Sequence, residues 1–154
     1  MCILDVEPFE NSAENETANS PDGRTGKYEI TCTKIRNLTK YKEIKEIVAP
    51  GQKSISETKL PFFLSGQYIY VWDNKKTCTL LSEIFGNGID FNFLDLKNEV
   101  SKIWPSFANK DSKDLLSVSK SAKYSDTPVT VSESLLNLFV TYANALSAKK
   151  NPHL

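Results

Sequence analysis

Two short stretches of the chain have the residue pattern of a β-strand. Tyr28, Ile30 and Cys32 alternate with polar residues, which predicts a half-buried strand beginning near Lys27. Residues 67–72 consist mainly of β-favouring residues that would lie on both faces, which predicts a central strand.

Apolar positions spaced three and four residues apart predict a series of short helices. The first covers residues 39–48 behind a Thr39 cap, and Pro50–Gly51 ends it. Residues 127–131 are expected to be extended because Thr127 precedes a proline. Further helices are expected to begin at the capping residues Thr77, Asn92, Asp111 and Ser132 and to end near Gly86, Pro105, Val118 and Leu146.

Composition divides the chain into a tail and a domain. Residues 10–26 contain no large apolar side chain, and residues 1–26 carry six carboxylates against Arg24 alone. Such a segment cannot bury enough surface to offset its ordering entropy, so we expect residues 1–26 to be a disordered acidic tail. Residues 27–148 are expected to form one α+β domain, a small mixed sheet packed with four to five short helices, and residues 149–154 a frayed end.

Cysteine usage and hydropathy indicate the compartment. The three cysteines are far apart in sequence and form no disulfide pattern, which favours a reducing environment. We identify no signal peptide or membrane-spanning run. These features predict an intracellular protein.

Residues suited to catalysis or metal binding are sparse. The single histidine, His153, is next to last, so neither a Ser–His nor a Cys–His nucleophile system has a credible base. No paired Cys or His spacing of the zinc-site type is present. Gly86–Asn87–Gly88 follows a predicted helix rather than a strand, so it predicts a helix stop and not a phosphate loop. We therefore expect no catalytic residue, no metal and no cofactor.

Two groups of side chains suggest binding. Residues 27–154 carry a net charge of +5, and Lys97, Lys102, Lys110 and Lys113 would form one basic face if their segments pack side by side. The chain has only two arginines, so base-specific readout would be weak. An aromatic concentration before and within the second strand is either core or a partner-binding patch, and comprises Phe62, Phe63, Tyr68, Tyr70 and Trp72.

From residue 67 onward the order of elements resembles the Ski/Sno/Dachshund homology domain of nuclear transcriptional regulators. The predicted strand leads through a short polar turn to Cys78–Thr79–Leu80, and predicted helices with an intervening extended segment follow to residue 146. The resemblance implies a mixed α/β domain, nuclear localisation, and a platform for corepressors and other regulators, with DNA contact in some members. These properties are implied by the resemblance alone.

Three hypotheses follow. The first is a non-enzymatic adaptor domain of a nuclear transcription or chromatin regulator that recruits protein partners, and its oligomeric state stays open. The second is a nucleic-acid-binding domain that uses the lysine face. The third is a small enzyme that uses only carboxylates and hydroxyls, which would require a deep polar pocket.

Overall fold

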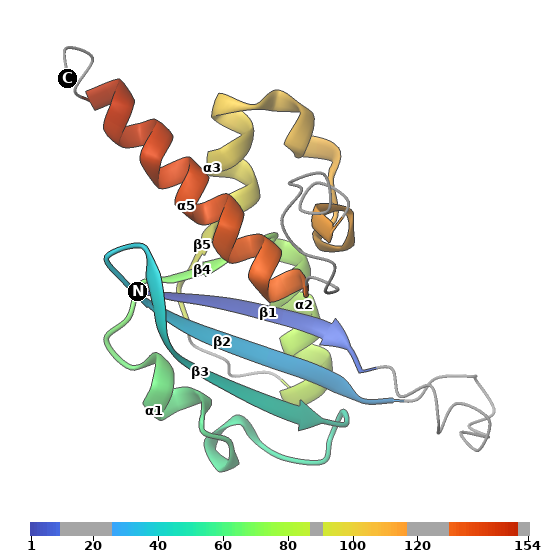
Figure 1. Cartoon of the computed structure of the whole chain (residues 1–154). Coiled ribbons are helices and arrows are strands. Elements are labelled where there is room, and N and C mark those ends of the chain that lie inside the picture. The colour runs from blue at the N-terminus through green and yellow to red at the C-terminus, as the bar shows by residue number, and fades with distance from the viewer. Residues whose placement is uncertain (10–25, 87–90, 117–129, 151–154) are drawn as a thin grey trace.

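A five-stranded mixed sheet forms the centre of the molecule (Figure 1). The computed structural model describes residues 1–9, 26–86, 91–116 and 130–150, and for residues 149 and 150 it describes the backbone only. The strand order is β3-β2-β1-β4-β5. The strands are β1 (Cys2–Pro8), β2 (Tyr28–Arg36), β3 (Thr39–Val48), β4 (Ile69–Val71) and β5 (Phe93–Asp95). Strand β1 pairs antiparallel with β2 and parallel with β4, and β4 pairs parallel with β5.

Helices cover both faces of this sheet, so the predicted α+β fold is confirmed. The α-helices whose bounds are described are α1 (Leu60–Leu64), α2 (Asn74–Phe85), α3 (Leu96–Ile103) and α5 (Val131–Lys150). Three short 3-10 turns, η1 (Ile55–Glu57), η2 (Pro105–Asn109) and η3 (Ser112–Asp114), connect them. None of the helices in the described ranges is long and apolar enough to cross a lipid bilayer.

The strand β1 corrects the predicted acidic tail. Residues 1–26 were expected to be disordered, yet Cys2–Pro8 forms the middle strand of the sheet. Its first three strand residues are at most 1% exposed. The apolar residues of β1 face both sides of the sheet, and their burial offsets the entropy cost of ordering the strand. The acidic composition of residues 1–26 as a whole hid this contribution. Residues 10–25 of the expected tail lie outside the described residues.

The segment 39–48 is a strand and not the predicted helix. It forms a hairpin with β2 through Asn37 and Leu38, whose φ angles of 53° and 61° both lie in the left-handed region that a two-residue hairpin turn requires. The segment carries apolar residues at helical spacing, but its residues also suit an edge strand. Ladder hydrogen bonds to β2 and the buried Val48 decide between the two.

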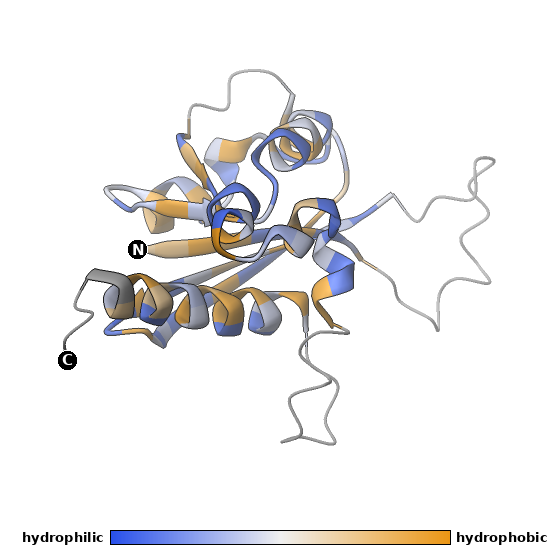
Figure 2. Ribbon diagram, turned by 90° about the horizontal axis from the view of Figure 1, so that it is seen from above, coloured by the Kyte–Doolittle hydropathy of each residue, from blue (hydrophilic) through white to orange (hydrophobic). Residues whose placement is uncertain are grey.

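Two hydrophobic cores flank the sheet. One lies between the sheet and helices α1 and α2 and contains Cys2, Leu4 and Val6 of β1. The other lies beneath α3 and α5, where Ile3 of β1 meets Leu135. Figure 2 shows apolar residues along β1 and α5. A central strand that serves both cores requires apolar side chains on both faces, which is the pattern of residues 2–4.

Helix starts are shifted from several predicted caps. Asp73 caps α2 instead of Thr77, and Asp95 caps α3 instead of Asn92, because residues 93–95 are used as β5. For α5, the hydroxyl oxygen of Thr130 accepts a hydrogen bond from the Glu133 N–H at 3.2 Å, so α5 begins before the expected cap Ser132. Asp111 caps η3 as predicted, and Gly86 ends α2 with a φ of 80°. Residues 127–129 of the expected extended segment lie outside the described residues.

Candidate functional site

The carboxyl ends of β1, β4 and β5 lie along one edge of the sheet and gather acidic side chains. From β1 the chain continues to β2 on one side, whereas from β4 it continues to β5 on the other. The place where connections from neighbouring parallel strands leave in opposite directions is called a topological switch point. Ligands of open α/β sheets bind there, outside the carboxyl ends of the parallel strands. We call the group at this edge the carboxyl-edge network, and its members are Asp5, Glu7, Asp73, Lys76, Asp95, Lys97, Asp111 and Ser112.

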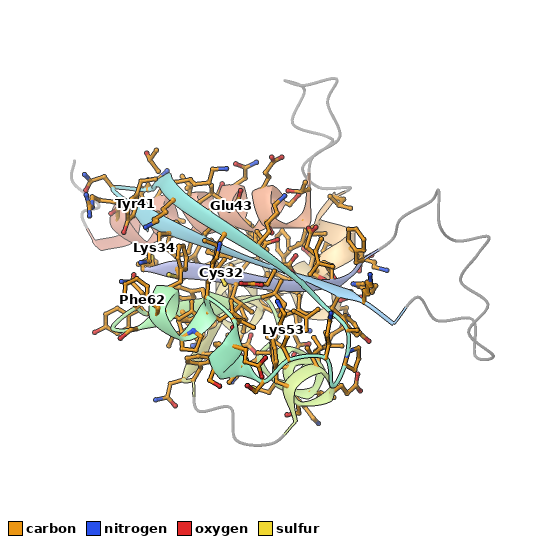
Figure 3. All side chains as sticks on the ribbon, turned by 90° about the horizontal axis from the view of Figure 1, so that it is seen from below. Cys32, Lys34, Tyr41, Glu43, Lys53 and Phe62 are labelled. Atoms are coloured by element: carbon orange, nitrogen blue, oxygen red, sulfur yellow. The ribbon has the colours of Figure 1, made fainter. Side chains whose placement is uncertain are left out.

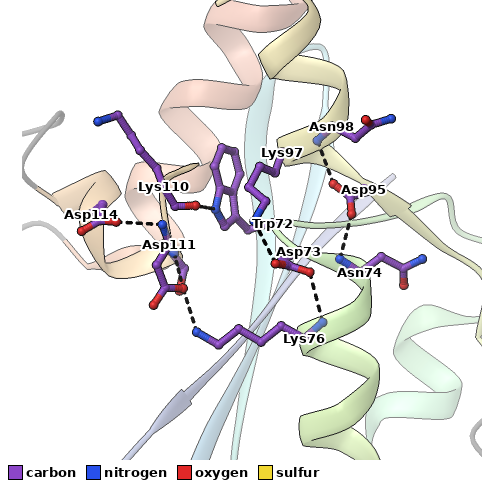
Figure 4. A network of polar contacts seen from close by, with 11 residues as sticks. Trp72, Asp73, Asn74, Lys76, Asp95, Lys97, Asn98, Lys110, Asp111 and Asp114 are labelled. Atoms are coloured by element: carbon purple, nitrogen blue, oxygen red, sulfur yellow. Dashed lines mark hydrogen bonds and ion pairs between the residues drawn. The ribbon is translucent and has the colours of Figure 1, made fainter. Parts of the chain in front are cut away.

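Two of these carboxylates cap α-helices (Figure 4). The Asp95 carboxylate accepts hydrogen bonds from the backbone N–H of Asn74 at 3.0 Å and of Asn98 at 2.8 Å, so it serves the starts of α2 and α3 together. The Asp73 carboxylate accepts from the backbone N–H of Lys76 at 3.1 Å and pairs with the Lys97 ammonium at 2.9 Å. Burial opposes ionisation of Asp73, but these hydrogen bonds and the lysine charges together lower its pKa.

Lys110 and Asp111, which precede η3, connect this segment to the rest of the network. Lys76 Nζ lies 2.7 Å from Asp111 Oδ1, and this hydrogen bond lowers the pKa of Asp111 and raises that of Lys76. One residue earlier, the Lys110 carbonyl accepts a hydrogen bond from the Trp72 indole N–H at 2.9 Å. The Trp72 ring is buried beside Phe107. These contacts fix Asp111 against β4, although nearly forty residues separate the two in sequence.

Asp5 and Glu7 are the members whose carboxyl groups cap no helix. Asp5 is 8% exposed, and burial, followed by the charges of Glu7 and Glu29, raises its pKa well above the ordinary aspartate value. Burial also raises the pKa of Glu7, which accepts a hydrogen bond from the Ser112 hydroxyl at 2.9 Å. Glu29 stands directly opposite Glu7 on β2. A buried carboxyl with a raised pKa at this position is a candidate functional group.

The space beside Asp5 is small, whereas an open pocket of about 480 Å³ lies beside Glu7 and is lined by Glu29 and Lys113, among others. A cavity of about 20 Å³ is lined by Asp5, Asp73, Lys76, Thr77 and Asp111, among others. This volume accommodates about one water molecule. Within the described ranges, His, Cys, Asp and Glu side chains form no group of three or more suited to hold a metal ion.

The four lysines that the sequence suggested for nucleic-acid binding lie on several elements. Lys97 is paired with Asp73, and Lys102 on α3 is paired with Glu99 at 3.1 Å. Lys110 follows η2, with its ammonium 6.0 Å from the Phe107 ring centre, and Lys113 belongs to η3. Two of the four positive charges are therefore compensated by carboxylates.

The predicted aromatic group is divided between core and surface. Phe63 and Trp72 are buried at 4% and 3% exposure, and Tyr70 packs on Phe139 with ring centres 5.1 Å apart. By contrast, Phe62 is 89% exposed and Tyr68 73% exposed. The sequence alone could not separate these roles, because adjacent residues of a helix or strand point in different directions.

A second charged region was missed by the sequence analysis. Five of the twelve residues from 34 to 45 are cationic and only Glu43 is acidic, so this stretch carries a net charge of +4. The expected helix at 39–48 separated these charges from β2, and the hairpin brings them together. We call the group of Lys34, Arg36, Tyr41 and Lys42 the hairpin-end surface. Lys40 and Lys45 lie opposite Ile35 and Thr31, so they belong to the other face of the sheet.

Comparison with protein-family models, curated proteins and solved structures finds no match for this chain.

Proposed function

We propose that the protein is a non-enzymatic interaction domain that binds protein partners through Phe62 and Tyr68. The observation that carries the proposal is their exposure, 89% and 73%, in a fold that buries Phe63 and Trp72 nearby in sequence. A solvent-exposed aromatic side chain contributes little to folding, but it supplies large contact area and binding energy when a partner covers it. The wider role in a nuclear regulatory assembly comes from the Ski/Sno/Dachshund resemblance.

Backbone contacts and buried neighbours hold each of these two residues in place. Tyr68 directly precedes β4, and its carbonyl accepts a hydrogen bond from the Cys2 N–H at 2.7 Å, which fixes it beside the start of β1. Phe62 lies in α1, whose neighbouring residues Leu60, Phe63 and Leu64 are buried and hold the short helix in place. Rigid presentation of exposed aromatic residues lowers the entropy cost of binding.

The test uses the full chain as bait, because a fragment that begins at residue 27 would lack the central strand β1. Wild-type protein and the Phe62→Ser/Tyr68→Ser double variant are compared by quantitative affinity capture from nuclear extract treated with nuclease. We expect a defined set of proteins to be depleted at least tenfold on the double variant. A tenfold loss corresponds to about 1.4 kcal/mol of binding free energy, which removal of an interface anchor produces.

The control for this experiment is Phe63→Leu, which changes the adjacent buried ring and leaves both exposed rings in place. It should retain the captured set, while thermal unfolding verifies that all variants are folded. Equal capture by the wild type and the double variant would show that Phe62 and Tyr68 are not the binding surface.

A carboxylate-based enzyme is the second candidate function, and Asp5 is the observation that favours it. Its raised pKa and the neighbouring Glu7 are typical of a carboxyl pair that donates and accepts protons. Hydrolysis of chromogenic phosphate mono- and diesters, acetate esters and glycosides, with and without magnesium, tests this candidate. An activity that Asp5→Asn lowers at least about a hundredfold would support it, and no turnover of any of these substrates by wild-type protein would count against it.

A further inference from the structure

Most cationic side chains at the hairpin end form no ion pair with another residue that the structure describes. Among the described residues, ion pairs within 4.0 Å include Lys40 with Glu43 at 3.6 Å, but none includes Lys34, Arg36, Lys42 or Lys45. The nearby acids are already engaged, since Glu43 also accepts a hydrogen bond from Thr33 and Glu46 accepts one from the Lys59 N–H. Among the described residues, these positive charges are therefore left without a carboxylate that compensates them.

Strand register places two of these lysines directly against each other. Lys34 and Lys42 are opposite residues of the antiparallel β2–β3 pair, so both point to the same face of the sheet. Like charges at opposite positions destabilise a hairpin. Lys34 also lies over the Phe63 ring at 4.4 Å, which holds its ammonium in place. An anion that lies between the two ammonium groups would relieve their repulsion.

An aromatic ring is built into the same charged surface. The register shift between Lys34 and Ile35 leaves Tyr41 as the extra residue of a β-bulge, a feature that re-aims a side chain. The Tyr41 ring is 48% exposed, and the Arg36 guanidinium lies 4.6 Å from its centre. Figure 3 shows Tyr41 and Lys34 near one end of the sheet.

The turn beside these residues is strained. Leu38 adopts a φ of 61°, a conformation that is unfavourable for a residue with a branched side chain. Its side chain is 39% exposed, so core packing does not account for this conformation. The two-residue hairpin turn requires this conformation, and it fixes how β2 and β3 meet beside Tyr41.

We propose that the hairpin-end surface binds single-stranded nucleic acid without sequence specificity. Lys34, Arg36 and Lys42 would contact successive phosphates, and a base would stack on the Tyr41 ring. A duplex does not offer an unstacked base to this ring, and a single arginine gives little base readout. The inference goes beyond the proposed function and does not depend on Phe62 or Tyr68.

The test is fluorescence anisotropy of the full chain with a labelled thymidine oligomer of about twelve nucleotides, a length within the range of known single-strand sites. Neutralising three or four phosphates gives a slope of log affinity against log salt of about −2 to −3. We expect Lys42→Glu to weaken binding at least about tenfold and to make this slope shallower. Tyr41→Ala is expected to weaken binding about fivefold or more with the slope unchanged, because it removes stacking and no charge.

The matched control is Lys102→Glu, which makes the same charge change at a lysine already paired with Glu99. It should retain affinity within about twofold. A loss equal to that of Lys42→Glu would overturn the assignment of the site, because net charge alone would then explain binding. Equal or tighter binding of a duplex, of phosphatidylserine vesicles or of polyglutamate at the same salt concentration would overturn the assignment of the ligand, as would no binding at low salt.

Discussion

Lysines at the two ends of the sheet differ in whether they pair with a carboxylate. At the carboxyl edge, Lys76 and Lys97 lie within 3 Å of carboxylates that also cap helices. At the hairpin end, Lys34 and Lys42 face each other, neither forms an ion pair with another described residue, and Tyr41 is half exposed. The first arrangement holds distant segments together, whereas the second leaves positive charges and an aromatic ring available to a ligand. A lysine-rich sequence is therefore informative only when the partners of each lysine are known.

The largest expected effect is the difference in the free energy of unfolding between Trp72→Ala, a core variant, and Phe62→Ala, a surface variant. Trp72 is 3% exposed and its indole N–H bonds the Lys110 carbonyl, so its loss should lower the free energy of unfolding by about 3–5 kcal/mol. Phe62 is almost fully exposed, and its loss should change stability by less than about 0.5 kcal/mol. Urea unfolding measures both, and similar values for the two variants would contradict the division between core and surface.

A smaller effect, dependent on pH, is expected from Asp5→Asn. Because the pKa of Asp5 is raised in the folded state, folding favours its protonated form, and the free energy of unfolding falls as pH rises from the ordinary aspartate value through the raised one. Asparagine cannot ionise, so the variant should be more stable than wild type at neutral pH. The difference should vanish below about pH 4. Chemical unfolding across this range tests the sign, and a less stable variant at neutral pH would show that Lys76 holds Asp5 ionised.

Substitution of Asp73 separates the helix cap from the ion pair. Asp73→Asn retains a cap for α2 but loses the charge that pairs with Lys97, and because this pair is partly exposed the cost should be only about 0.5 kcal/mol. Asp73→Ala loses both and should cost about 1–2 kcal/mol. Since the pKa of Asp73 is lowered in the folded state, its contribution is present above the ordinary aspartate pKa and is lost as pH falls through the lowered value. Thermal unfolding that ranks the two variants equally would assign the whole effect to the ion pair.

The smallest effect on stability is expected from Lys42→Glu. The new carboxylate would face Lys34, so the free energy of unfolding should rise by up to about 0.5 kcal/mol. A variant that is slightly more stable and yet loses nucleic-acid binding would separate the ligand-binding role of this end from its folding role. A loss of stability instead would mean that Lys42 has a structural partner.

Local chemistry in the sequence determined a substantial part of the fold. Four features follow from residues within a few positions of each other: the strand that begins near Lys27, the stop at Gly86, the cap at Asp111 and the amphipathic character of the last helix. Propensity, capping and turn chemistry act over such short distances, so a sequence displays them directly.

Contacts between distant residues decided what the sequence left ambiguous. Cys2–Pro8 became the central strand because β2 and β4 pair with it on either side, although its surroundings in sequence are acidic. Segment 39–48 became a strand because its hydrogen bonds are made with β2, although its apolar spacing also suits a helix. Packing likewise decided whether a lysine pairs with an acid, as Lys76 and Lys97 do, or forms no ion pair with a described residue, as with Lys34 and Lys42. The physical reason is that pairing and burial are properties of two segments together, and neither segment alone encodes the other's position.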